Sequence, residues 1–160
     1  MKFKPKNKTE LSQLMEKLIK ERGKSGNFND IDTSSITDMS GLFLKSDFNG
    51  DISKWDVSNV RDMRFMFLGT RKFNQDISSW NVSNVRDMSY MFRRSIGFNG
   101  NISSWNVSNV TNMCGMFSGA KSFNQDLSDW DVSNVTDMRV MFDRTPIKNK
   151  AKMWFPECYI

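Results

Sequence analysis

The stretch FNQDISSWNVSNVRDMSYMF, residues 73–92, returns with few changes every 25 residues in this chain of 160 residues. The corresponding blocks begin at Phe48, Phe73, Phe98 and Phe123. A unit of this length cannot bury its apolar face alone and does so by stacking on its neighbours. The period therefore predicts a repeat solenoid, in which function lies at the positions that fail to repeat.

Two apolar spacings inside one unit predict its local structure. Residues 80–82 alternate in polarity as a strand does, whereas residues 85–92 place apolar side chains at every third position, as in a short helix or 3₁₀ turn. Asn84 and Asp87 have the spacing of a helix-capping pair. Each unit is therefore predicted to run strand, turn, short helix and loop, with the strands of stacked units in a parallel ladder about 4.8 Å apart.

Different segments flank the full repeats, and together they are predicted to form one domain. Residues 1–27 are expected to be a basic leader followed by an N-terminal capping helix over 10–22, with Thr9 as its N-cap. Residues 28–147 form the solenoid of one degenerate and four full repeats, and the degenerate unit aligns with the next at an offset of 24. Residues 148–160 are rich in large apolar side chains and are predicted to be a C-terminal cap.

Charge and composition argue against two classes of function. The net charge is +5, but residues 1–27 alone hold eight basic against three acidic residues, so the repeats are close to neutral. A nucleic-acid binder is expected to have a basic stripe along its working face, so nucleic acid is not the expected partner. Without histidine, a Gly-rich phosphate loop or a nucleophile–base pair, we expect no enzyme activity and no cofactor.

The cysteine pattern and the hydropathy set the remaining bounds. The spacing of Cys114 and Cys158 fits neither a disulfide framework nor a metal site. No apolar run approaches the ~20 residues that span a bilayer, and the basic start is not followed by the apolar stretch of a signal peptide. As written, the chain is expected to have no membrane span and to be cytoplasmic.

Residues identical in every unit are assigned structural roles. The tryptophans are predicted to stack in or beside the core, rather than to form a platform for sugars or bases. The asparagines are predicted to form a buried ladder, in which each amide satisfies backbone groups of its neighbour. The aspartates of the repeat suggest calcium, but the glycine-dense pattern of calcium-binding β-rolls is absent. The structural residues are Trp55, Trp80, Trp105, Trp130, Asn49, Asn74, Asn99 and Asn124.

Positions that differ between units are the candidates for function. The first two full units combine arginines with Phe65 and Tyr90, and the later units do not. Arginine with aromatic residues is the composition of protein contact sites, the alternative being a solvated rim. The predicted partner-binding residues are Arg61, Arg64, Phe65, Arg86, Tyr90, Arg93 and Arg94.

The words FNQDISSWNVSNVRDMSYMF at 73–92 and FNQDLSDWDVSNVTDMRVMF at 123–142 resemble the BspA-like leucine-rich-repeat family of bacterial surface proteins, also grouped as a mycoplasma-type repeat. IDTSSITDMSGLF at 31–43 looks like the opening unit of that family. The resemblance implies an α/β repeat solenoid of right-handed, leucine-rich-repeat-like coils with an N-terminal capping helix. It also implies protein–protein contact and, if the chain is a fragment of an exported protein, display on the cell surface for adhesion.

The leading hypothesis is therefore a non-enzymatic protein–protein interaction or adhesion-type scaffold of bacterial origin, monomeric or weakly self-associating. One alternative is a nucleic-acid-associated protein that uses the basic N-terminus, with Lys2, Lys4, Lys6 and Lys8, and the arginine cluster. Another is a structural array that self-associates through an incompletely covered end coil. A salt titration separates the first two, because phosphate binding is lost at salt concentrations that specific protein contacts survive.

Overall fold

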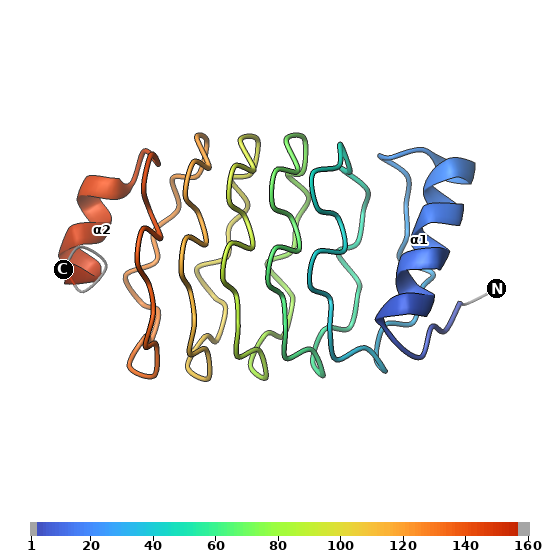
Figure 1. Cartoon of the computed structure of the whole chain (residues 1–160), viewed down its shortest axis with the longest axis horizontal. Helices are drawn as coiled ribbons and strands as arrows, with labels where there is room; N and C mark the ends of the chain where they lie inside the picture. The colour runs from blue at the N-terminus through green and yellow to red at the C-terminus, as the bar shows by residue number, and fades with distance from the viewer. Residues whose placement is uncertain (1–2, 157–160) are drawn as a thin grey trace.

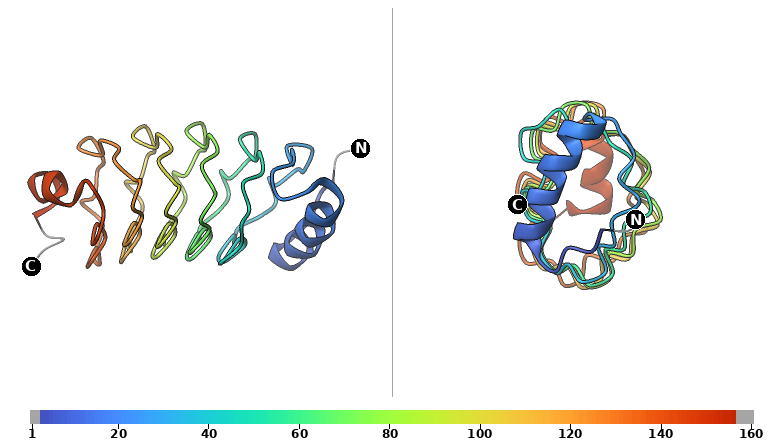
Figure 2. Two further views of the ribbon diagram at one scale, coloured as in Figure 1. Left: turned by 90° about the horizontal axis from the view of Figure 1, so that it is seen from above. Right: turned by 90° about the vertical axis from the view of Figure 1, so that its right-hand side faces the viewer.

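The computed structural model describes residues 3–156, and in it the repeats form coils stacked side by side between two helices (Figure 1). Helix α1 spans Lys8–Arg22 and helix α2 spans Lys148–Trp154. Seen along the stack, the coils superpose as one closed outline (Figure 2). Parallel bridges at the predicted offsets of 24 and 25 residues, Asp38 to Asp62 and Asp62 to Asp87, fix their register. The first to last coils are residues 28–47, 48–72, 73–97, 98–122 and 123–147.

The predicted α/β coil of strand plus short helix is wrong, and with it the leucine-rich-repeat-like fold class. Within residues 3–156 the only α-helices are α1 and α2, and the parallel pairing consists of isolated bridges without a strand or sheet. The segment predicted as a short helix contains a residue in the left-handed region, such as Phe65 with φ 59° or Tyr90 with φ 58°. An α-helix or 3₁₀-helix needs consecutive right-handed residues, so none can run through this segment.

Backbone hydrogen bonds of this segment alternate between its own coil and the next one. The N–H of Phe65 donates to the carbonyl of Ser89 in the following coil at 3.1 Å. The N–H of Met66 instead donates to the carbonyl of Met63, three residues earlier, at 3.2 Å. The alternation recurs in the coils that follow, so neighbouring coils are bonded as strands would be, although no coil is extended.

The predicted capping pair also has another role. The Asn84 amide donates to the carbonyl of Ser58 in the preceding coil at 2.7 Å, so it bonds between coils and caps no helix. The Asp87 carboxylate accepts the N–H of Ser89 at 2.8 Å, two residues later, and so holds a turn. The spacing was correct for a local hydrogen bond, but it did not specify which backbone conformation that bond stabilises.

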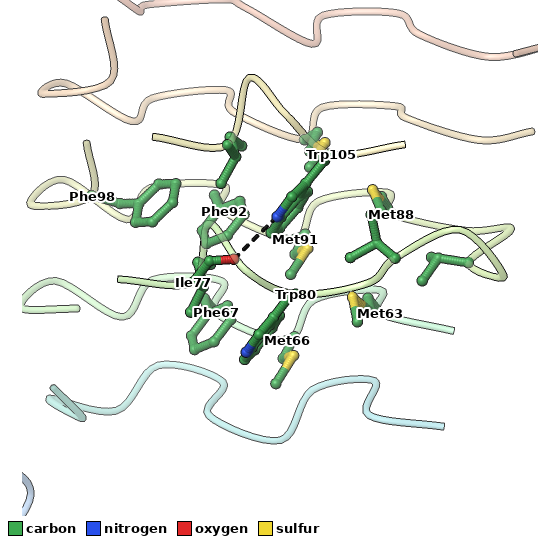
Figure 3. Packing of buried hydrophobic residues seen from close by; sticks show 14 of the residues in the cluster. Met63, Met66, Phe67, Ile77, Trp80, Met88, Met91, Phe92, Phe98 and Trp105 are labelled. Carbon is green, nitrogen blue, oxygen red and sulfur yellow. Dashed lines mark hydrogen bonds between the residues drawn. The ribbon is translucent and has the colours of Figure 1, made fainter. Parts of the chain in front are cut away.

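Stacked phenylalanines form the centre of the core. Where the third coil passes into the fourth, the rings of Phe92 and Phe98 lie face to face, with centroids 3.9 Å apart. Phe92 stacks on Phe117 and Phe98 on Phe123 of the next coils, each at 5.8 Å. The result is two adjoining columns of rings along the stack, part of which Figure 3 shows. Ring burial is the main contribution that such a core makes to stability.

The four repeated tryptophans are buried, with 3–5% of their surface exposed. The indole Nε1 of Trp105 donates to the carbonyl of Ile77 at 3.1 Å (Figure 3). Trp55, Trp80 and Trp130 make the equivalent bond to a coil that precedes them. Each tryptophan therefore joins two coils and has no open face on which a base or sugar could stack.

The asparagines form a ladder, but not the buried one that was predicted. The side-chain oxygen of Asn74 accepts the N–H of Asn99 at 2.9 Å, and that of Asn99 accepts the N–H of Asn124 at 2.9 Å. Asn49 begins the ladder by accepting the N–H of Asn74 at 3.0 Å. Asn74, Asn99 and Asn124 are exposed, so the ladder ties the coils together along their surface.

The two helices cover the ends of the stack. In α1, the helix predicted over 10–22, the residues Leu11, Met15 and Leu18 are buried in the same core as the coils. Its N-cap is Asn7, whose side chain accepts the N–H of Glu10, and not Thr9 as predicted. No helix in the described part of the chain is long and apolar enough to cross a membrane. Of the predicted C-terminal cap, residues 157–160 with Cys158 lie outside the described residues.

Val140 occupies a left-handed position that suits glycine. Its φ is 52° and its side chain is 54% exposed, whereas Gly41 and Gly115 stand at the equivalent positions of other coils. We expect Val140→Gly to raise the free energy of unfolding by about 1 kcal/mol, because it removes backbone strain and little packing. Urea denaturation measures the change. The control is Asp129→Gly, at an exposed residue outside the left-handed region, and it should lower the free energy of unfolding. If Val140→Gly also lowers the free energy of unfolding, the strain argument is contradicted.

Acid should weaken the turns that aspartates hold. The Asp76 carboxylate accepts the hydroxyl and the N–H of Ser78 at 2.7 and 2.9 Å, and these bonds lower its pKa. A lowered folded-state pKa adds stability that is complete above the unfolded value of about 3.9 and is lost as pH falls through the folded value. In urea titrations at a series of pH values, Asp76→Asn should therefore show a smaller loss of stability below pH 4 than the wild type. Asn101 already holds the equivalent turn, and identical pH profiles would count against this mechanism.

Candidate functional site

Three of the seven predicted contact residues meet on the surface of the second and third coils. The rings of Phe65 and Tyr90 are parallel, with centroids 5.4 Å apart and an interplanar angle of 1°. The guanidinium carbon of Arg93 lies 5.3 Å from the centroid of the Tyr90 ring, within cation–π range. Phe65 is 37% exposed and Tyr90 is half-buried. We call these three residues the aromatic patch.

The Tyr90 ring packs against the backbone of Gly115 in the next coil, and we call this contact surface the seat of Tyr90. A Cβ atom at Gly115 would lie 2.6 Å from a carbon of that ring, so only glycine lets the ring lie this close to the backbone. The Cys114 Sγ and the Tyr90 hydroxyl oxygen lie 3.2 Å apart, within hydrogen-bonding distance, and the contact with Cys114 raises the pKa of Tyr90. Gly115 and Cys114 therefore hold the Tyr90 ring in one place, as expected of a contact residue.

The other predicted arginines are not part of the aromatic patch. Arg64 is directed to the Asp62 carboxylate, with Nη2 2.6 Å from Oδ2, which holds the guanidinium over its own turn. Arg61 and Arg86 are exposed and adjacent, since the Arg86 N–H donates to the Arg61 carbonyl at 2.9 Å. Neither makes a cation–π contact or an ion pair within residues 3–156.

Arg94 belongs to a second feature, which the sequence analysis missed. It occupies the position at which successive coils carry a basic residue and a glycine in turn, all with positive φ. We call the three basic residues the cation row. From the first coil to the last, this position holds Lys45, Gly69, Arg94, Gly119 and Arg144, with φ of 53°, 69°, 57°, 75° and 58°.

Two shallow hollows lie along the cation row. One is lined by Lys45, Asp47, Leu68, Gly69, Arg71 and Arg94. The other is lined by Arg71, Arg94, Ile96, Gly119, Lys121 and Arg144. Arg71 and Arg94 line both hollows, so the two form one continuous surface.

The near-neutral charge of the repeats argued against a basic stripe, and for that reason the cation row was not found from the sequence. Charge was summed over whole coils, where the aspartates that hold turns cancel the basic residues. Alignment of the repeats could have revealed the row, because Lys45, Arg94 and Arg144 alternate with glycines at one position of the repeat.

The repeated aspartates are used in turns rather than gathered in a site. Asp51, Asp76 and Asp126 each accept the N–H of the serine two residues later. Within the described residues, no group of three or more His, Cys, Asp or Glu side chains is placed to hold a metal ion. The aromatic patch and the cation row offer aromatic rings and cations for non-covalent contact.

Gly115→Ala tests the seat of Tyr90. The added Cβ would collide with the Tyr90 ring and would also strain a φ of 59°, so we expect the free energy of unfolding to fall by about 1–3 kcal/mol in urea denaturation. Gly119→Ala is the matched control, because its φ is 75° but its Cβ would meet Arg94 only at an ordinary 3.4 Å. Equal losses in the two variants would show that the ring does not depend on Gly115.

Comparison with known proteins places the chain in a family. No curated protein and no solved structure matches it significantly. A family model described as "Mycoplasma protein of unknown function, DUF285" matches residues 9–101 and 80–155. The two overlapping segments cover most of the chain, whereas the resemblance to BspA-like leucine-rich-repeat proteins receives no support from these matches. The chain therefore belongs to the DUF285 family of mycoplasma proteins of unknown function.

Proposed function

We propose that this chain is a non-enzymatic scaffold that binds another protein through the aromatic patch. The observation that carries the proposal is the placement of Phe65 and Tyr90. Repeated aromatic residues in the described chain are buried between coils, whereas these two lie at a position that other coils fill with glycine or valine. The stack of coils does not need aromatic side chains there.

Their backbone conformation supports the same conclusion. Phe65 and Tyr90 have φ of 59° and 58°, a region that is costly for any residue with a Cβ atom. A bulky residue that persists in a strained conformation, at a position where other coils have glycine, is a candidate for function. Exposed aromatic rings beside arginine are the composition of the energetic centres of protein interfaces. The resemblance to bacterial surface proteins favours the same class of function, contact of an adhesion type.

Site-specific photo-crosslinking tests the proposal. Benzoylphenylalanine at position 65 or 90, in extract of the native host, should give adducts with one recurring protein, and the same group at Lys17 on α1 should not. Binding of that purified protein should weaken at least tenfold in Phe65→Gly/Tyr90→Gly, which is about 1.4 kcal/mol. Both changes introduce glycine, which other coils already have at this position of the repeat, so the variant should fold.

Val140→Gly is the matched control, since it makes the same kind of change at the same position of the last coil and should leave binding within twofold. The proposal fails if adducts form equally at position 65 and at Lys17. It also fails if the double glycine variant binds the captured protein as the wild type does.

A further inference from the structure

We propose that the cation row holds an acidic, partly apolar segment of the partner protein, extended along the axis of the stack. The inference rests on the proposed function and adds the chemistry of the partner. It is drawn from the geometry of the row, from the unpaired charges of Lys45 and Arg94, and from the aliphatic side chains that line its hollows.

The geometry follows from the alternation of basic residues with glycines. A Cβ at Gly69 would lie 3.4 Å from Cγ of Lys45, and one at Gly119 would lie 3.4 Å from Cγ of Arg94. The aliphatic stems of Lys45 and Arg94 therefore lie along the glycine of the following coil. This places one cation of the row on every second coil, at intervals of about 10 Å if stacked backbones are about 4.8 Å apart.

The backbone conformation shows that the fold does not require these cations. Lys45, Arg94 and Arg144 have φ between 53° and 58°, which is unfavourable for a side chain with a Cβ atom. Glycine fills the same position in the alternate coils without that cost. Strain that serves no packing need indicates that the three basic residues are present for an interaction.

Two of the three cations of the row, Lys45 and Arg94, are not neutralised by the protein itself, whereas Arg144 pairs with Asp143, its Nε lying 3.5 Å from Oδ2. Within residues 3–156, Lys45, Arg71, Arg94 and Lys121 form no ion pair. Of the nearby acids, Asp47 lies 4.0 Å from Lys24, and Asp143 is bonded to Lys148 at 2.8 Å. The excess of positive charge attracts an anionic partner.

The apolar residues favour a polypeptide over a nucleic acid. Leu68 and Ile96 each line one of the hollows, and Ile96 is 40% exposed. Leu44, beside Lys45, is 47% exposed. Nucleic-acid interfaces are more polar than this, and bases stack on aromatic rather than aliphatic side chains. Cations interspersed with aliphatic residues match a segment in which acidic and apolar side chains are mixed.

Fluorescence anisotropy with three labelled probes tests the inference. The probes are a peptide of repeating Glu-Glu-Leu, an oligoglutamate and an oligothymidylate, all of equal charge, at low and at physiological ionic strength. The mixed peptide should bind at least fivefold more tightly than either of the others. Arg94→Gly/Arg144→Gly should weaken that binding at least tenfold while its melting temperature stays the same or rises, because glycine relieves the left-handed strain.

Two controls separate the charge of the row from its side-chain shape and from overall charge. Arg94→Lys/Arg144→Lys keeps both charges at the same positions, so it should bind the peptide within twofold of the wild type. Lys17→Ser/Lys20→Ser removes two charges from α1 and should also change binding by less than twofold.

Each contrary result has one meaning. If oligothymidylate binds more tightly than the mixed peptide, the surface is one for nucleic acid. If oligoglutamate binds as tightly as the mixed peptide, apolar side chains do not contribute to recognition, and if no probe binds, the row is not a binding site. Each of these results overturns the inference. If the protein captured at position 65 binds Arg94→Gly/Arg144→Gly undiminished, the inference fails while the proposed function stands. If the peptide binds the row but position 65 captures no protein, the proposed function fails instead.

Discussion

The structure depends on left-handed residues that recur at two positions of every coil. They allow each N–H in the segment around Phe65 to bond in turn to its own coil and to the next one. Successive coils are thereby held in register without a strand, and the register brings Phe92 over Phe117 and Phe98 over Phe123. The aromatic core and the inter-coil hydrogen bonds of the tryptophans follow from that register.

The same constraint explains where a binding surface can arise. A left-handed position is satisfied best by glycine, and Gly41, Gly69, Gly115 and Gly119 fill it in several coils. Larger residues at these positions are not needed for stacking, so their chemistry is available for contact with a partner. Phe65 and Tyr90 at one such position, and the cation row at the other, use this freedom at the cost of local strain.

Sequence reasoning found the parts of the molecule that depend on side-chain periodicity. The period predicted the register and the residues that repeat in every unit. Helical spacing of apolar residues predicted the helix that ends at Arg22, and the contrast between units pointed to Phe65, Tyr90 and Arg93. It was wrong about the short helix, because apolar residues at every third position fit a succession of turns as well as a helix turn. Glycines four residues apart, Gly115 and Gly119, were the available sign of left-handed turns.

The sequence by itself determined that similar coils would pack on one another, since a residue type repeated at a fixed interval meets its own copy when coils stack. Only the tertiary structure decided the backbone conformation and the neighbours of the variable side chains. Arg93 and Arg94 are adjacent in the chain and both line a hollow beside Arg144, yet only Arg93 lies over Tyr90 and only Arg94 lines the hollow that extends to Lys45. The reason is the sign of φ, which fixes the direction of each side chain and cannot be read from hydrophobic spacing.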